Sequence, residues 1–347
     1  MKKIILINIY IGKLPNWINL FLQTCKNNPT IDWLIFSNDK TPNNTPPNVK
    51  IVNTDLNRIV SLARKKTDTK VRIFETRAIC NLKPAYGVIF EDYLHDYDFW
   101  GHCDLDIMCG DIRKFITEKM LDQYDVISSC ILHIAGPFTI YRNCAKINYL
   151  FKENPKYKEA FEKGKNVGFD EVGFGKEYFG FDLTVTQAQE KGLIKVAMQK
   201  VALRDKNNKK WLKNLIKKVK PIKKHIKFER EKAGICYYKN GKIFHKKTNE
   251  EFMYFHFLKW KKRMFLPLMI EWDDSIKYWE MRKRGIKLFF NSKRDLFKYY
   301  TGNFLKFPAI VNIALYLLKI PINKVNWFFR GLTRKGKRCY RWINSNW

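Results

Sequence analysis

Apolar runs alternate with amphipathic stretches along the first half of the chain. Residues 3–12 (KIILINIYIG) and 31–39 (IDWLIFSND) are almost continuously apolar, which is typical of strands buried on both faces of a parallel sheet. Between them, residues 16–28 carry apolar side chains at helical spacing. This alternation predicts an α/β fold with a mostly parallel sheet. The further elements predicted are a helix at 85–97 and strands at 49–55, 98–106, 124–131 and 136–143.

The pattern changes after about residue 205. Residues 206–232 carry twelve basic side chains and two acidic ones, and their apolar residues keep helical spacing. A β-hairpin is predicted next, because Asn240-Gly241 separates two short apolar runs and is a strong turn pair. Farther along, the chain becomes aromatic and basic, and no acidic residue follows Asp295. We therefore expect an α/β domain over residues 1–262, with 206–232 as a basic amphipathic insertion, and a basic aromatic extension over residues 263–347.

Composition narrows the classes of function. The 347 residues include 66 Lys and Arg against 33 Asp and Glu, which gives a formal net charge of +33. Such an excess indicates an anionic partner: a nucleotide, a nucleic acid or an anionic membrane surface. The eight cysteines form no C-x-x-C pair, which argues against a zinc ribbon or a disulfide scaffold and is typical of a reducing compartment. No run of about 20 apolar residues is present, so no transmembrane span is expected, and the short first apolar run is expected to be a strand instead of a signal peptide.

Two aspartates stand one residue apart in the apolar stretch 97–112 (YDFWGHCDLDIMCGDI). In an extended segment, residues i and i+2 point to the same side roughly 7 Å apart, so Asp104 and Asp106 would aim their carboxylates at one point. Adjacent carboxylates repel each other unless a cation lies between them, and Mg²⁺ or Mn²⁺ prefers such oxygen ligands. We therefore predict a divalent metal site at a strand end, where α/β sheets bind ligands. The alternative is that the D-x-D only forms a turn into a helix capped by Asp111.

The run 81–115 (NLKPAYGVIFEDYLHDYDFWGHCDLDIMCGDIRKF) resembles a family of bacterial GT-A-type glycosyltransferases found in polysaccharide loci. These proteins share a K-P-A-Y-G helix, a W-G-H-x-D-x-D strand and a following G-D-I-R, and the similarity extends over residues 1–262. The resemblance implies a GT-A-like, Rossmann-like fold in which Asp104 and Asp106 hold a metal ion and the diphosphate of a sugar-nucleotide donor. The chain departs from the pattern at Asn81, where relatives have an Asp, so any role of that carboxylate in donor binding is not carried over.

A second candidate ligand lies late in the sequence. His256 ends the apolar run YFH, and a neutral imidazole there could complete the metal shell, while Lys259 could reach the donor diphosphate as a point charge. In GT-A transferases a late His followed by a Lys often has these roles, and this pair is similar. The alternative for His256 is a hydrogen-bonded core histidine.

Other candidates for the donor side rest on single residues. Lys83 precedes Pro84 and a predicted helix, a position suited to phosphate or sugar hydroxyls, although it could equally be a solvated charge. Gly12 follows the first strand and would let the backbone approach a nucleotide. Asn38 and Asp39 at the end of the second strand could contact the base or ribose, or could simply form a turn.

The acceptor side is assigned to two later segments, 133–143 and 167–174. Gly136 and Thr139 resemble positions that approach the donor or acceptor sugar in such folds. Asp170 and Glu171 lie between glycines in a predicted loop, and either could be the general base for an acceptor hydroxyl if the reaction inverts the anomeric centre. Helix capping is the alternative for both.

The basic amphipathic stretches predict contact with an anionic membrane surface. We therefore expect a metal-dependent hexosyltransferase that uses a nucleoside-diphosphate sugar and a lipid-linked glycan acceptor in surface-polysaccharide assembly. It would be a cytoplasmic protein, peripheral on the inner face of the cell membrane. A basic nucleic-acid-binding protein is the competing class, but the sequence shows no nucleic-acid-binding module, so no nucleic acid partner is expected. A non-catalytic scaffold with a transferase fold is the other alternative.

Overall fold

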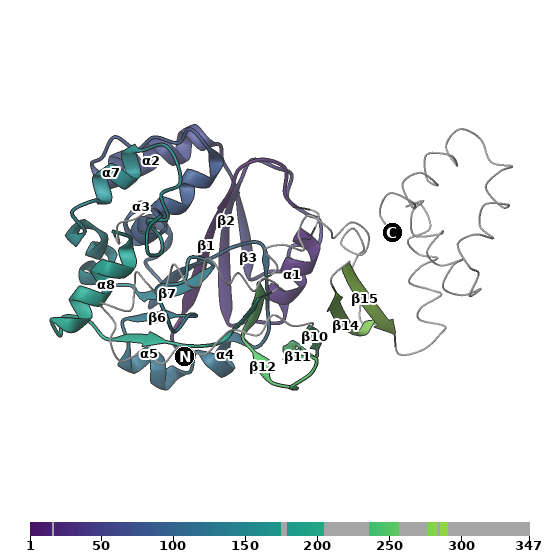
Figure 1. Cartoon of the computed structure of the whole chain (residues 1–347). Helices are drawn as coiled ribbons and strands as arrows, with labels where there is room; N and C mark the ends of the chain where they lie inside the picture. The colour runs from purple at the N-terminus through teal and green to yellow at the C-terminus, as the bar shows by residue number, and fades with distance from the viewer. Residues whose placement is uncertain (16, 175–178, 205–235, 257–275, 283–284, 291–347) are drawn as a thin grey trace, which may run out of the picture.

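A large mixed sheet forms the centre of the protein. The computed structural model of the chain describes residues 1–15, 17–174, 179–204, 236–256, 276–282 and 285–290. Within these residues the largest sheet has seven strands in the order β3-β2-β1-β4-β7-β6-β8 (Figure 1). Its strands are β1 (Ile4–Tyr10), β2 (Ile31–Ser37), β3 (Val49–Asn53), β4 (Phe99–Cys103), β6 (Val126–Ser128), β7 (Phe138–Arg142) and β8 (Val196–Met198).

Most strand pairs of this sheet are parallel. β1 pairs in parallel with both β2 and β4, β2 with β3, and β6 with β8, whereas β7 runs antiparallel to β4 and β6. The α/β fold with a mostly parallel sheet is therefore confirmed. The continuously apolar sequence of β1 and β2 follows from their central position, because both faces of these strands are covered.

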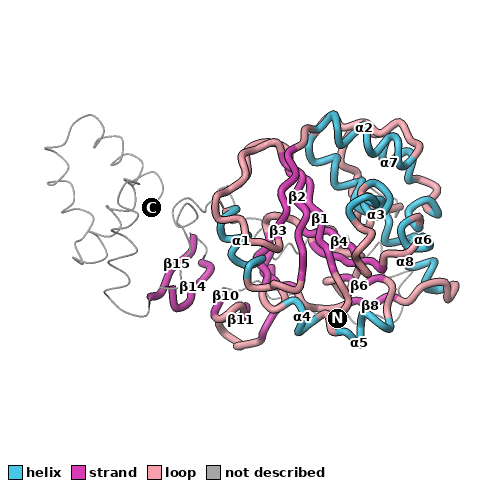
Figure 2. Tube along the Cα trace, turned by 180° about the vertical axis from the view of Figure 1, so that it is seen from behind, coloured by secondary structure: helices cyan, strands magenta, loops and turns pink. Residues whose placement is uncertain are grey.

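Helices cover the two faces of the sheet (Figures 1 and 2). Alternate residues of β1 point to different layers, with Ile5 and Ile7 in one apolar cluster and Ile4 and Leu6 in the other. The first layer includes α2 (Leu56–Thr67), α3 (Tyr86–Ile89), α6 (Ala145–Asn148), α7 (Tyr157–Glu162) and α8 (Phe181–Glu190). The second includes α1 (Ile18–Lys26), α4 (Ile112–Phe115) and α5 (Glu118–Gln123).

Two smaller sheets extend the second layer. In one, β13 (Tyr254–His256) lies between β5 (Ile107–Cys109) and β9 (Ala202–Arg204). The other has the order β12-β11-β10-β14-β15 and contains the predicted hairpin, whose turn residues Asn240 and Gly241 both have positive φ, 51° and 75°. Its strands are β10 (Cys236–Lys239), β11 (Lys242–His245), β12 (Glu251–Phe252), β14 (Ile276–Arg282) and β15 (Gly285–Phe290).

β14 lies after residue 262 and pairs with β10, which lies before it. The domain boundary near residue 262 stays a prediction. The basic insertion 206–232 and most of the extension lie outside the described residues. Among the helices that are described, none combines the length and the apolar character needed to cross a membrane.

The long helix predicted at 85–97 is wrong over most of its length. The segment contains one α-helical turn, α3, between two 3₁₀ helices, η1 (Thr76–Ala85) and η2 (Glu91–Tyr93). The α-helix stops at Phe90, whose φ of −111° leaves the helical region while its ring is buried in the core. Burial of the aromatic side chains against the sheet thus overrides the helical pattern, and η1 itself was not predicted.

The glycines of the K-P-A-Y-G and W-G-H segments allow these elements to pack closely. A Cβ on Gly87 would lie 2.6 Å from the ring of Trp100, and a Cβ on Gly101 would lie 2.5 Å from the carbonyl oxygen of Thr139. The helix layer and strand β7 therefore approach β4 to a distance that only glycine permits. This packing fixes β4, whose end carries the D-x-D.

Candidate functional site

The D-x-D lies in a turn at the carboxyl end of β4. Asp104 directly follows Cys103, the last residue of β4, and the turn ends where β5 begins at Ile107. Two long-range bonds hold it: the Asp104 amide donates to the Pro137 carbonyl at 2.9 Å, and Trp17 Nε1 donates to the Leu105 carbonyl at 2.7 Å. The predicted extended geometry is therefore wrong, although both carboxylates do converge, because the turn brings them together.

His256 reaches this turn through strand pairing. β13 runs antiparallel to β5, and His256 lies opposite Ile107, the residue directly after Asp106. Asp104, Asp106 and His256 each offer a ligand atom, and these atoms all lie within 4.8 Å of one another. His256 Nε2 is 3.2 Å from Asp106 Oδ1. The structure thus brings together two residues of the D-x-D and a histidine 150 positions away.

The chemistry of this group fits a divalent cation. His256 is buried; among the described residues its Nδ1 has no hydrogen-bond partner, and its Nε2 faces Asp106 Oδ1. A buried polar atom without a partner is costly, and a bound cation would satisfy one of these nitrogens. Two carboxylates and an imidazole form a donor set suited to Mn²⁺ or Mg²⁺. A metal-ligand role for His256 stays a prediction, as does the core-histidine alternative.

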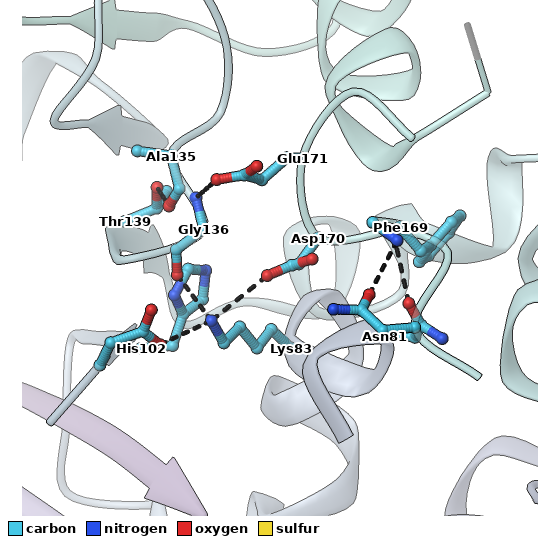
Figure 3. Close-up of polar contacts among 12 residues, drawn as sticks. Asn81, Lys83, His102, Ala135, Gly136, Thr139, Phe169, Asp170 and Glu171 are labelled. Atoms are coloured by element: carbon cyan, nitrogen blue, oxygen red, sulfur yellow. Dashed lines mark hydrogen bonds and ion pairs between the residues drawn. The ribbon is translucent and has the colours of Figure 1, made fainter. Parts of the chain in front are cut away.

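Lys83 joins the metal-side and acceptor-side candidates. Its buried ammonium lies 2.8 Å from Asp104 Oδ1, 2.7 Å from the Gly136 carbonyl oxygen and 3.2 Å from Asp170 Oδ2 (Figure 3). Burial alone would lower the pKa of Lys83, but the neighbouring Asp104 and Asp170 carboxylates outweigh it, and the net direction is upward. Lys83 is therefore a charged, fixed member of the site and not a solvated surface lysine.

Asp170 and Glu171 face Gly136 from a tight turn between Gly168 and Gly173. Glu171 Oε1 accepts a hydrogen bond from the Gly136 amide at 3.0 Å, and a Cβ on Gly136 would lie 2.8 Å from Asp170 Oδ2. Asp170 is buried, and burial together with the nearby Glu171 and Asp104 carboxylates raises its pKa to about 6 despite the opposing effect of Lys83. The predicted acceptor-side residues thus border the predicted metal ligands.

Asn81 holds the loop that leads to Asp170. Its amide nitrogen donates to the carbonyl oxygens of Ala160 and Lys165, and its Oδ1 accepts from the amides of Val167 and Phe169, as Figure 3 shows in part. All four hydrogen-bonding positions of the amide are used. Asn81 therefore acts as an amide that fixes the loop before Asp170.

The remaining donor-side candidates form a braced loop. The amide of Gly12, whose φ is 114°, donates to Asn38 Oδ1 at 2.7 Å, and Asp39 Oδ2 accepts from the Leu14 amide at 2.7 Å. Backbone hydrogen bonds, from Leu14 first, lower the pKa of Asp39. Asn38 and Asp39 thus shape the loop after β1, and direct contact of these residues and Gly12 with a nucleotide stays a prediction.

Three other residues named from the sequence have different outcomes. Thr139 is buried in β7 and donates its hydroxyl to the Ala135 carbonyl, so it shapes the 135–139 segment from within. The predicted cap role of Asp111 is confirmed, because its side chain accepts from the Lys114 amide at the start of α4. Lys259 lies outside the described residues.

Sequence reasoning missed two polar residues close to the site. Asn8 is buried in β1, donates to the Cys103 carbonyl next to Asp104, and leaves its Oδ1 without a hydrogen-bond partner among the described residues. His102 is buried in β4, and its burial, followed by the nearby charge of Lys83, lowers its pKa well below the usual value. A polar residue inside an otherwise apolar strand was the available indication for both.

Comparisons with known proteins give a family and a set of partial structural likenesses. The model of the "Family of unknown function (DUF6625)" matches residues 6–280. No curated protein matches the chain. Among solved structures, a galactosyltransferase LgtC in complex with donor and acceptor sugar analogs is 10% identical over 63% of this chain and 84% of its own, with a TM-score of 0.35.

Two further solved structures are similar at the same level. Mouse xyloside xylosyltransferase 1 is 9% identical over 72% of this chain and 98% of its own, with a TM-score of 0.39. The glycosyltransferase GlyE of Streptococcus pneumoniae TIGR4 is 11% identical over 57% of this chain and 45% of its own, with a TM-score of 0.30. At these TM-scores the function has to be argued from the residues of this chain.

Proposed function

Since the chain belongs to DUF6625, a family of unknown function, we propose from its site that this member is a metal-dependent glycosyltransferase of the GT-A type. The carrying observation is the group formed by Asp104, Asp106 and His256, which lies at the carboxyl end of a central strand of an α/β sheet. This is the edge of such sheets at which nucleotides and other ligands bind. The proposed donor is a nucleoside-diphosphate sugar.

The local charge of the site supports a bound cation. Four carboxylates gather here among the described residues: Asp104 and Asp170 contact the Lys83 ammonium at 2.8 and 3.2 Å, Asp106 lies 3.2 Å from His256 Nε2, and Glu171 follows Asp170 beside Gly136. The chain as a whole has a net charge of +33, so this acidic group is a local exception. A diphosphate would be repelled from such a group unless a divalent cation were bound as well. Asp104, Asp106 and His256 would hold that cation, which as a Lewis acid would neutralise the charge of a diphosphate leaving group.

The other residues would position the reacting groups. Lys83 fixes Asp104 on one side and Asp170 on the other, so the metal side and the acceptor side keep a constant spacing. With its pKa raised to about 6, Asp170 is mostly ionised at neutral pH and could take the proton of an acceptor hydroxyl in an inverting transfer. Glu171, bonded to the Gly136 amide, is the second candidate general base.

The proposed donor sugar, acceptor and location follow from the composition of the chain and from its resemblance to GT-A-type glycosyltransferases of polysaccharide loci. We propose a hexose-type donor sugar and a lipid-linked glycan acceptor of surface-polysaccharide assembly, such as capsule or O-antigen. The basic segments 206–232 and 263–347 would bind the anionic inner face of the cell membrane, where such an acceptor is presented. The protein would then be cytoplasmic and peripheral. The net charge of +33 and the absence of acidic residues after Asp295 support this part.

A turnover screen tests the proposal. The full-length protein is incubated with a panel of nucleotide sugars and Mn²⁺, and release of nucleoside diphosphate is measured. We expect release from at least one donor, loss of that release in EDTA, and at least about a hundredfold loss in Asp106→Ala, because removal of a charge-stabilising group at a reacting centre has effects of this size. Asp122→Asn, which changes an exposed carboxylate, is the control and should behave as wild type. Equal release in EDTA, or in Asp106→Ala, would refute the metal mechanism.

A further inference from the structure

Two exposed phenylalanine rings lie against the loop that carries Asp170 and Glu171. Phe74 is 72% exposed and Phe174 is 47% exposed, although neither side chain gains from contact with water. Phe174 lies four positions after Asp170 in the same loop, and Phe74 lies two positions before η1, which carries Lys83 near its other end. Exposed aromatic side chains next to a candidate site indicate a surface that binds something.

Each ring packs against a glycine. Gly164 and Gly168 are both buried, and both have positive φ, 72° and 71°. A Cβ on Gly164 would lie 2.3 Å from Phe74 Cδ2, and a Cβ on Gly168 would lie 2.7 Å from Phe174 Cδ1, so a side chain at either glycine would displace the ring. A backbone hydrogen bond also joins the two segments, because the Phe74 amide donates to the Gly164 carbonyl at 2.8 Å. The two rings are therefore held in place against one short segment, 164–168.

This segment is fixed to the site. The Asn81 side chain donates to the Lys165 carbonyl and accepts from the Val167 amide. The Glu171 amide donates to the Gly168 carbonyl at 3.1 Å. One braced loop thus carries Phe174 and the carboxylates of Asp170 and Glu171, and Phe74 packs against the same loop at Gly164.

We propose that Phe74 and Phe174 are a platform for the sugar rings of an oligosaccharide acceptor, an inference that rests on the proposed glycosyl transfer. The face of an aromatic ring carries partial negative charge, and the C–H face of a pyranose is apolar and weakly positive, so the two stack without any charged group. Gly168 lies four positions after Gly164, so the Cα atoms of the two glycines are at most about 14 Å apart. A di- or trisaccharide is long enough to contact both rings over any separation up to this limit. The proposed acceptor is an oligosaccharide whose end reaches Asp170.

Saturation-transfer NMR on the full-length protein tests the platform without turnover. The probes are glucose, lactose, maltotriose and cellotriose, and the buffer contains EDTA and no nucleotide. We expect transfer to the ring C–H protons of lactose or a trisaccharide and much less to glucose. Phe74→Ala and Phe174→Ala should each weaken the apparent affinity about tenfold, the effect of losing one aromatic contact, while Phe74→Tyr and Phe174→Tyr should retain binding. Leu193→Ala removes a comparably exposed apolar side chain elsewhere and should bind as wild type.

The outcomes separate this inference from the proposed function. Absence of transfer to every probe, or equal transfer in the double variant Phe74→Ala/Phe174→Ala, would overturn the platform whatever the turnover screen shows. Loss of binding to phosphatidylglycerol vesicles in the same double variant, with sugar binding intact, would also overturn it and assign the rings to a lipid surface. Ring-dependent sugar binding in a protein that releases no nucleotide from any donor would support the platform and contradict the proposed transfer.

Discussion

At the scale of single residues, the site depends on one buried ammonium. Lys83 contacts the carboxylates of Asp104 and Asp170 and the Gly136 carbonyl oxygen. Without that charge, Asp104 and Asp170 would lose their common partner, and the loops that carry them would lose a shared contact. The residue types were predictable from the sequence, since Lys83, Asp104, Asp170 and His256 were all candidates. The sequence does not predict that these side chains lie together, because this depends on contacts between positions far apart in the chain.

The raised pKa of Asp170 predicts a pH dependence of stability. The carboxyl has a pKa of about 6 in the folded chain against 3.8 for the free group, so the folded state binds its proton more tightly than the unfolded state does. Its contribution to stability is therefore fully present below pH 3.8 and is lost as the pH rises through about 6. Urea denaturation from pH 4 to pH 7 in EDTA should show this loss for wild type and not for Asp170→Asn. Parallel pH curves for these two proteins, with Asp122→Asn as the reference, would contradict the assigned pKa.

At the scale of elements, the sequence was informative where burial leaves a pattern. Strands β1 and β2 were predictable because both of their faces are covered, and the hairpin was predictable because Asn240 and Gly241 adopt positive φ. The D-x-D turn was predicted as extended, since nothing local specifies its bonds from Trp17 and to Pro137. Likewise, the pairing of β13 with β5 that places His256 is a long-range choice that periodicity does not encode.

The hydrogen bonds of Asn81 join η1 to the loop before Asp170, so their loss should lower the stability of the fold. Asn81→Asp keeps the shape but replaces two N–H donors by a carboxylate oxygen that faces the Ala160 and Lys165 carbonyls. We expect a loss of roughly 3 kcal/mol in the free energy of unfolding, because two buried acceptors lose their donors. Asn166→Asp is the matched control, since Asn166 uses its Oδ1 to accept from the Gly168 amide and an aspartate preserves that bond. Chemical denaturation of both variants measures this loss. Equal stability of Asn81→Asp and wild type would show that contacts other than those of Asn81 hold the loop.

At the scale of the whole molecule, the excess positive charge and the acidic site are opposite in sign. The chain carries +33 overall, and its basic segment 206–232 and most of 263–347 lie outside the described residues, so the proposed membrane contact rests on the sequence. Near an anionic leaflet each Lys or Arg contributes about 1 kcal/mol, and this contribution is screened by salt. Aromatic side chains in the interface add a part that salt does not weaken.

We therefore predict salt-sensitive but incomplete release from anionic vesicles. Full-length protein should float with phosphatidylglycerol vesicles at low salt, be partly released by high salt and be fully released by detergent. Phosphatidylcholine vesicles are the control and should bind far less. Failure to float with anionic vesicles, together with retardation of a generic oligonucleotide at physiological salt, would favour the nucleic-acid alternative instead.

The most direct test of the central claim is a calorimetric titration of the full-length protein with nucleoside diphosphates, in Mn²⁺ and in EDTA. The claim is that Asp104, Asp106 and His256 hold a divalent cation that permits a diphosphate to bind at the end of β4. We predict binding of at least one of UDP, GDP, ADP and CDP in Mn²⁺ with one site per chain, no measurable binding in EDTA, and loss of the Mn²⁺-dependent binding in Asp106→Ala and His256→Ala but not in Asp122→Asn. Nucleotide binding of equal strength in EDTA, or unchanged in Asp106→Ala, would contradict the account.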